Sequence, residues 1–278
     1  MGRRAPRLRG APLWVEVRRP LAAAGLVFQN AAVLRAFSLV YWVFVVVTMP
    51  VFFSGALLVF LLTVLFDRRR VAVHLYSCFW ASFYIYANPL WHVRFEGRER
   101  LPWHAPAVIV ANHLSLVDIL ALYGLYRPFK WVSKAEMFRV PVVGWNMFIN
   151  DYVRLTRGDR DSIRAMMEHC RAHLARGSPL LIFPEGTRSR DGRLQAFKDG
   201  AFRLAMEAKV PLIPVVIQGT YETVPKHGLV LRNAMRGRVK VLAPLDPAAF
   251  PTAAALRDAA RQAIANELGE DARAAQPA

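Results

Sequence analysis

The chain has 278 residues and a net charge of +17, from 37 lysine and arginine residues against 20 aspartate and glutamate residues. Hydrophobic residues make up 55% of it, enough for the core of one large domain with an appended segment. The charge favours anionic partners such as membrane lipids, nucleic acids, phosphorylated substrates or an acidic carrier protein. The two cysteines, Cys78 and Cys170, exclude a framework of several disulfide bonds and make a reducing compartment the default.

Residues 1–35 form a basic N-terminal segment. The first long apolar run begins only at Ala36, and the arginines that precede it are Arg3, Arg4, Arg7, Arg9, Arg18, Arg19 and Arg35. A run that starts so late and continues for so long does not fit the apolar part of a signal peptide, so we expect no signal peptide.

Residues 36–92 are predicted to hold membrane-embedded and interfacial helices. The 31 residues from Ala36 to Phe66 carry no charged side chain, which is typical of a membrane element; a core helix of a soluble protein is the alternative. One helix of this length would measure about 46 Å, against about 30 Å for the bilayer core, so it would tilt or kink. Pro50 leaves a re-entrant hairpin open, which would keep the flanking arginines, Arg68 to Arg70 included, in the cytoplasm.

The next stretch, Val71 to Val93, lacks formal charges and is rich in Trp, Tyr and Phe. Because aromatic side chains of this kind prefer the headgroup region, we predict an interfacial helix that ends before Pro89. A second membrane-spanning helix is the alternative.

Residues 93–268 are predicted to form the catalytic domain, because short apolar runs there alternate with amphipathic stretches. The predicted strands are Ala107–Ala111, Phe129–Ser133, Phe148–Leu155, Leu180–Phe183, Leu212–Ile217 and Val239–Ala243. The predicted helices end near Tyr126, run from the N-cap Asp161 to about Ala175, and cover Gly200–Ala208 and Ala253–Leu268. This alternation indicates an α/β fold with a largely parallel sheet flanked by helices, and residues 269–278 are expected to be disordered.

The loop Asn112–Asp118 follows the first predicted strand of the domain, at the edge of the sheet where ligands bind in such folds. If Ser115 caps the next helix, Asp118 occupies its third position, and His113 stays in the loop within reach of the Asp118 carboxylate. An imidazole anchored by a carboxylate keeps one ring nitrogen free to accept a proton, as a general base requires. The alternative is that Asp118 only caps a helix and His113 is an ordinary loop residue.

A second loop, Phe183–Arg188, follows the strand that begins at Leu180. Gly186 allows the backbone to approach a ligand closely, exposed N–H groups there can bind an anion, and Arg188 offers a planar fork for phosphate oxygens. Glu185 is expected to orient Arg188 or to accept a substrate hydroxyl. A polar turn between a strand and a helix is the alternative.

Together the two loops resemble the signature blocks of the glycerolipid acyltransferase family, which includes the bacterial 1-acylglycerol-3-phosphate acyltransferases. Asn112–Asp118 is similar to its Asn-His-x-x-x-x-Asp block, and Phe183–Arg188 matches its Phe-Pro-Glu-Gly-Thr-Arg block in full. Weaker blocks are similar around Lys134 to Arg157, at Phe197–Phe202 and at Val210–Val215. The resemblance covers about residues 93 to 245.

The resemblance implies direct transfer of a fatty acyl group from a thioester of acyl carrier protein or coenzyme A to the sn-2 hydroxyl of 1-acyl-sn-glycerol-3-phosphate, giving phosphatidic acid. It implies that His113 and Asp118 are catalytic. The residues that it implies for binding the substrate phosphate are Lys134, Arg157, Glu185, Gly186, Thr187 and Arg188. We expect no metal and no cofactor in this reaction.

The expected partners are membrane lipid, a lysophospholipid acceptor and the acyl donor, at the inner membrane with the catalytic domain facing the cytoplasm. Nucleic acid is not expected, because the aromatic residues cluster in the apolar segment and not among the basic residues. Three alternatives stay open. They are an acyltransferase for another lysolipid such as lyso-ornithine lipid, a lipid hydrolase with Ser115 or Cys170 as nucleophile, and a non-enzymatic membrane- or nucleic-acid-binding protein.

Overall fold

The computed structural model describes residues 31–221, 223–224, 230–231 and 234–269, so most of the predicted basic segment and the predicted tail lie outside it. Within these residues seven strands form one sheet in the order β1-β7-β6-β2-β5-β3-β4. Only the β6–β7 pair is antiparallel, which confirms the predicted largely parallel sheet. The strands are β1 (Trp91–Glu96), β2 (Val108–Ala111), β3 (Lys130–Lys134), β4 (Val153–Leu155), β5 (Leu180–Ile182), β6 (Leu212–Gln218) and β7 (Met235–Val241).

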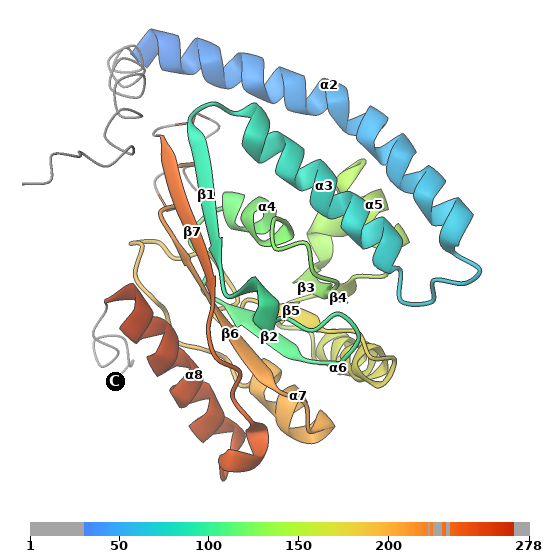
Figure 1. The fold of residues 1–278 in the computed structure, drawn as a ribbon, viewed down its shortest axis with the longest axis vertical. Coiled ribbons are helices and arrows are strands. Elements are labelled where there is room, and N and C mark those ends of the chain that lie inside the picture. The colour runs from blue at the N-terminus through green and yellow to red at the C-terminus, as the bar shows by residue number, and fades with distance from the viewer. Residues whose placement is uncertain (1–30, 222, 225–229, 232–233, 270–278) are drawn as a thin grey trace, which may run out of the picture.

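Helices cover both faces of this sheet (Figure 1). On one face α3 and α4 lie against the strands and α2 packs over α3; on the other face lie α6, α7 and α8. The helices are α2 (Ala31–Thr63), α3 (Val71–Ala87), α4 (Val117–Tyr123), α5 (Val143–Ile149), α6 (Arg160–Ala175), α7 (Gly200–Ala208) and α8 (Ala253–Leu268). Short 3-10 helices are η2 (Arg98–Arg100), η3 (Ala135–Arg139) and η4 (Pro247–Ala249).

α2 is one continuous helix that passes through Pro50, so a re-entrant hairpin within residues 36–66 does not form. Next to the proline, the hydroxyls of Thr48 and Ser54 donate to main-chain carbonyls one turn earlier, at 2.7 and 2.9 Å. The chain turns back only after Thr63, and α3 returns beside α2 (Figure 1). Among the described helices, α2 alone is long and apolar enough to cross a membrane.

α3 ends at Ala87, before Pro89, as predicted. Nine of its 17 residues are buried, among them Trp80 and Tyr84, because the helix lies between α2 and the sheet. The aromatic side chains that it leaves exposed are Phe79, Phe83 and Tyr86. α3 is therefore a layer of the folded domain, and only its outer edge can meet lipid.

The prediction of a strand over Phe148–Leu155 is wrong in its first half, since Phe148 and Ile149 end α5 and β4 begins at Val153. The side chain of Asn150 donates back to the Asn146 carbonyl at 2.8 Å and so continues the polar contacts of the helix end. Asp151 then turns the chain with a left-handed backbone (φ 57°) before the strand.

The N-cap of α6 is Asp159 and not Asp161, because the Asp159 carboxylate accepts the Asp161 N–H at 3.0 Å. α7 and α8 have the bounds that the sequence predicted.

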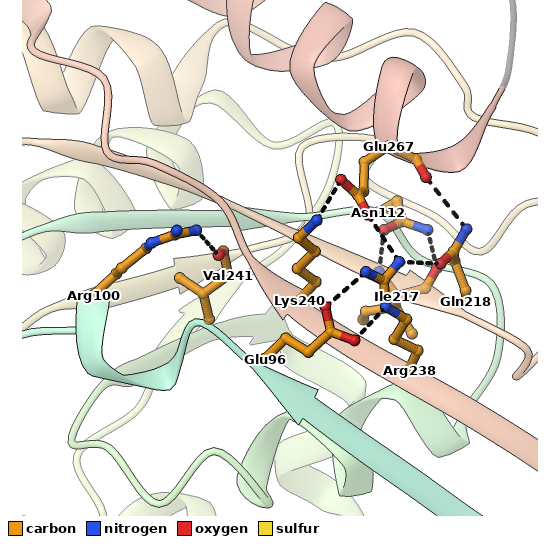
Figure 2. Close-up of polar contacts among 9 residues, drawn as sticks. All are labelled: Glu96, Arg100, Asn112, Ile217, Gln218, Arg238, Lys240, Val241 and Glu267. Atoms are coloured by element: carbon orange, nitrogen blue, oxygen red, sulfur yellow. Dashed lines mark hydrogen bonds and ion pairs between the residues drawn. The ribbon is translucent and has the colours of Figure 1, made fainter. Parts of the chain in front are cut away.

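The sequence did not predict β1, and it placed the start of β7 too late, at Val239 instead of Met235. Both strands largely alternate buried side chains with more exposed ones. Among the latter, Glu96, Arg238 and Lys240 form a polar network with Glu267 (Figure 2). In it the Arg238 guanidinium donates to both oxygens of Glu96, at 2.8 and 2.7 Å, and to Glu267 of α8 at 2.8 Å. These contacts join β1, β7 and α8 at one edge of the sheet.

Candidate active site

The two predicted loops lie side by side because the strands that lead into them are neighbours. β2 and β5 pair in parallel, with Val110 opposite Ile182, so both strands end at the same edge of the sheet. The loops are also bonded to each other. The His113 N–H donates to the Glu185 carboxylate at 2.8 Å, and the His113 carbonyl accepts the Ser189 N–H at 2.8 Å.

The Asp118 carboxylate is fully buried and accepts four hydrogen bonds. Its Oδ2 accepts from the His113 Nδ1 at 2.9 Å and from the N–H groups of Leu114 and Ser115 at 2.6 and 2.8 Å. Its Oδ1 accepts from the Thr220 hydroxyl at 2.5 Å. Because a carboxylate only accepts, Nδ1 of His113 carries the proton and Nε2 is the acceptor.

The helix after this loop starts at Val117, later than a cap at Ser115 requires. Asp118 still reaches back to the Ser115 N–H, which is half of the predicted capping box. His113 lies outside the helix, as the predicted contact with Asp118 required.

The imidazole of His113 is also held from the side. It stacks on the Phe183 ring at a centroid distance of 4.0 Å and an interplanar angle of 11°. The His113 side chain keeps 13% of its surface exposed, so the ring is fixed in orientation but still accessible. Phe183 and Asp118 together fix the ring in two directions.

A cavity of about 550 Å³ opens beside His113, between the sheet and the helices α2, α3 and α4. Its polar end contains six of the predicted site residues, which are His113, Lys134, Arg157, Gly186, Thr187 and Arg188. The rest of the wall is mostly apolar and aromatic, with Trp42, Val45, Met49, Trp80, Ala81, Tyr84, Leu120, Trp131 and Met147 among its side chains.

Three cationic side chains, those of Lys134, Arg157 and Arg188, line the same cavity as the His113 imidazole. Lys134 forms a half-exposed ion pair with Glu136 at 3.0 Å. Within the described residues, neither Arg157 nor Arg188 forms an ion pair, although both line the cavity. Uncompensated guanidinium groups at the mouth of a cavity attract an anion.

Glu185 was predicted to bind the phosphate, but its side chain does not line the cavity. The side chain is buried, its Oε1 accepts the His113 N–H, and its Oε2 accepts the Gln195 N–H at 3.3 Å. A carboxylate would repel a phosphate, so the position of Glu185 fits a residue that holds the two loops together. Gly186 has a left-handed backbone (φ 71°), and a Cβ there would lie 3.1 Å from the Lys198 ammonium.

Sequence reasoning missed Thr220, which donates to the Asp118 carboxylate from the end of β6. The available signal was that β6 is another predicted strand, so the Gly-Thr that follows it belongs to the same edge of the sheet. Asn112 ties this edge together, because its side-chain amide donates to the Ile217 carbonyl at 2.9 Å and accepts its N–H at 2.8 Å (Figure 2).

The alternative nucleophiles lie away from the cavity. Ser115 is fully buried and Cys170 is fully buried in the core under α6. Burial raises the pKa of the Cys170 thiol to about 12, so it is protonated at neutral pH. These positions argue against a hydrolase that uses either side chain.

Comparison with known proteins agrees with this geometry. The family model described as Acyltransferase matches residues 92–218. A 1-acyl-sn-glycerol-3-phosphate acyltransferase from Chlamydomonas reinhardtii is 37% identical over 239 residues, which are 85% of this chain and 70% of that protein. A chloroplastic 1-acyl-sn-glycerol-3-phosphate acyltransferase from Arabidopsis thaliana is 39% identical over 180 residues, 64% of this chain and 49% of that protein.

Among solved structures, that of the 1-acyl-sn-glycerophosphate acyltransferase PlsC from Thermotoga maritima is similar, with a TM-score of 0.68 and 25% identity. The match covers 88% of this chain and 100% of that one. With the catalytic loops, the sheet order and the relatives in agreement, the chain belongs to the acyltransferase family.

Proposed function

We propose that the protein transfers a fatty acyl group from a thioester to the sn-2 hydroxyl of 1-acyl-sn-glycerol-3-phosphate and so makes phosphatidic acid. One observation carries the proposal. A buried carboxylate sets the tautomer of His113 so that its acceptor nitrogen serves a cavity that is cationic at one end and apolar along the rest.

In this reaction His113 Nε2 takes the proton of the acceptor hydroxyl while the hydroxyl oxygen attacks the thioester carbonyl. Asp118 stabilises the imidazolium that forms, since its carboxylate already accepts from Nδ1 at 2.9 Å. When the tetrahedral intermediate collapses, the C–S bond breaks and the imidazolium proton goes to the leaving thiolate. The ester and the free thiol are the products, and His113 is neutral again. No acyl-enzyme forms.

Lys134, Arg157 and Arg188 would bind the phosphate of the acceptor at the polar end of the cavity. Lys134 would exchange its exposed contact with Glu136 for the phosphate. Holding the phosphate fixes the glycerol hydroxyl beside His113, and such positioning accounts for a large share of the rate in two-substrate reactions. Gly186 and Thr187 line the same end and bring main chain close to the headgroup.

The apolar part of the cavity matches an acyl chain in character, because its wall combines aliphatic and aromatic side chains from α2, α3 and α4. A fatty acyl chain that enters between α2 and α3 would leave its carbonyl near the polar end. The donor is expected to be acyl carrier protein or coenzyme A, since the basic surface suits the acidic surface of the first and the phosphates of the second.

The outer face of α2 supports the proposal of membrane attachment. The candidate membrane window of this helix is only 11% buried, and its exposed side chains include Leu39, Val40, Val46, Val47, Val51, Leu58 and Leu62. Arg68, Arg69 and Arg70 follow at the turn to α3, as expected for the cytoplasmic side of the inner membrane. With α2 in the bilayer, the cavity beside it would receive both lipids directly from the leaflet.

The test is to incubate the purified full chain with labelled acyl thioesters of both carriers and a panel of lysolipids, and to identify products by mass. Phosphatidic acid from 1-acyl-sn-glycerol-3-phosphate is the expected product. An acylated ornithine lipid as the preferred product would show a different acceptor, and release of free fatty acid would show a hydrolase. A His113→Ala variant with an unchanged rate of transfer would contradict the mechanism.

A further inference from the structure

Away from the catalytic loops, Asp151, His169 and His173 present one ligand atom each, and these atoms all lie within 4.8 Å of one another. The Asp151 carboxylate lies 3.3 Å from Nε2 of His169 through Oδ1 and 3.8 Å from Nε2 of His173 through Oδ2. The two imidazoles are one turn apart on α6 and stack at a centroid distance of 4.6 Å. Both rings therefore turn the same nitrogen to one carboxylate.

Hydrogen bonding within the described residues does not account for this arrangement. The contact from His173 at 3.8 Å is too long for a hydrogen bond, and its Nε2 is buried with no hydrogen-bond partner. The side chain of His173 is only 2% exposed, so water does not satisfy this atom from the surface. A buried nitrogen without a partner calls for an explanation, and a bound ion is one that fits a neighbouring carboxylate and a second imidazole.

We propose that Asp151, His169 and His173 bind a divalent transition-metal ion of the Zn²⁺ class. Two imidazoles and one carboxylate are ligands that Zn²⁺ prefers, with water in the fourth position. Zinc bonds of about 2.0 to 2.2 Å place tetrahedral ligand atoms roughly 3.3 Å apart, which the Asp151–His169 pair already matches. The pair to His173 would close by about half an ångström on binding.

Two neighbouring cations have to be compatible with a metal ion. The Arg176 guanidinium lies 3.7 Å from Asp151 and 3.4 Å from Nδ1 of His173, but it is 44% exposed and can turn to solvent. The Lys130 ammonium is buried and donates to the Asn150 carbonyl at 2.6 Å, so a main-chain acceptor already holds it.

The position of this site points to a structural role. Asp151 comes just before β4, and the His173 carbonyl accepts the Ser178 N–H just before β5, so the cluster lies where these strands begin. His113 follows the end of β2, at the opposite edge of the sheet. A metal here would clamp α6 to the turn between α5 and β4, and it would take no part in acyl transfer.

The test uses the full chain in detergent micelles after treatment with a chelator, titrated with Zn²⁺ by calorimetry. We expect one ion per chain, and His169→Ala and Asp151→Asn should each weaken binding by about tenfold or more. At a concentration about 100 times the Kd, zinc should raise the Tm by roughly 5 to 10 °C. His92→Ala is the matched control, because His92 is exposed on β1, at the opposite side of the sheet from β4, and it should bind like the parent.

Because Asp151→Asn and His169→Ala also remove an ion pair, the unfolding of each variant is measured with and without zinc. Loss of the zinc-dependent rise in Tm supports the proposal, whatever happens to the metal-free Tm. Replacing zinc with Co²⁺ should give the visible absorption bands of a four-coordinate ion in the parent and not in the variants. If the parent binds no zinc, the proposal is wrong. It is also wrong if both variants bind zinc as tightly as the parent does, since the ion then binds elsewhere.

Discussion

The two faces of the sheet are packed for different purposes. Under α6, α7 and α8 the apolar side chains pack into one core, in which Phe202, Leu204 and Leu256 are fully or almost fully buried. On the face covered by α3 and α4, with α2 outside them, the helices enclose a cavity of about 550 Å³ that reaches the His113 imidazole. The same strands thus carry a stabilising layer on one side and a substrate-binding layer on the other.

This difference teaches where mutations should act. A change on the α6–α8 face should lower the free energy of unfolding and leave substrate preference alone. A change at the cavity should alter transfer with little loss of stability. Variants on each face can break this division.

Removing the imidazole should have the largest effect. His113→Ala deletes the group that takes the hydroxyl proton, and we expect the rate of transfer to fall by about 10²- to 10⁴-fold. The Tm should change little, because the side chain lines a cavity and is not part of a closed core. The rate is measured with labelled thioester, and His92→Ala, an exposed histidine of β1, should keep the parent rate.

On the opposite face, Phe202→Ala should remove a fully buried ring from the core between α7 and the sheet. We expect the free energy of unfolding to fall by about 3 to 5 kcal/mol, measured by denaturant titration. The KM of the protein that stays folded should equal that of the parent. Phe79→Ala, where half of the ring is exposed on α3, is the control and should cost far less in detergent. A large rise in KM for the Phe202 variant would show that the faces are not independent.

At the polar end of the cavity, Arg188→Ala should raise the KM for the lysolipid about 10- to 100-fold. A lost charge-assisted hydrogen bond is worth about 1.5 to 3 kcal/mol, which is the energy behind this factor. The KM for the acyl thioester should stay near the parent value. Arg203→Ala, an exposed arginine of α7, is the matched control for the change in net charge. Equal loss of affinity for both substrates would mean that Arg188 does not bind the phosphate.

The smallest effect is expected at Thr220, whose hydroxyl donates to the buried Asp118 carboxylate. Thr220→Val keeps the shape and removes the donor, so kcat should fall by several-fold, for about 1 kcal/mol. Thr220→Ser keeps the hydroxyl and should restore most of the rate. If the valine variant lowers only the Tm, the residue supports the fold and does not help to position the catalytic pair.

The sequence by itself determined the elements whose signals are local. The bounds of α7 and α8, the end of α3 before Pro89 and the contact between His113 and Asp118 depend on residues within a few positions of one another. Periodicity, caps and a five-residue spacing are enough for such features, because the contacts that decide them form within one turn or one loop.

Only the tertiary structure decided the features that depend on partners far along the chain. β1 became a strand because β7, some 140 residues later, offers it a parallel edge, and Pro50 stays inside α2 because α3 supports that helix. Glu185 points to the His113 main chain and Thr220 to Asp118 across the ends of three adjacent strands. No local pattern records the order of strands in a sheet, so neither contact follows from local signals alone. Strand pairing and burial determine both contacts.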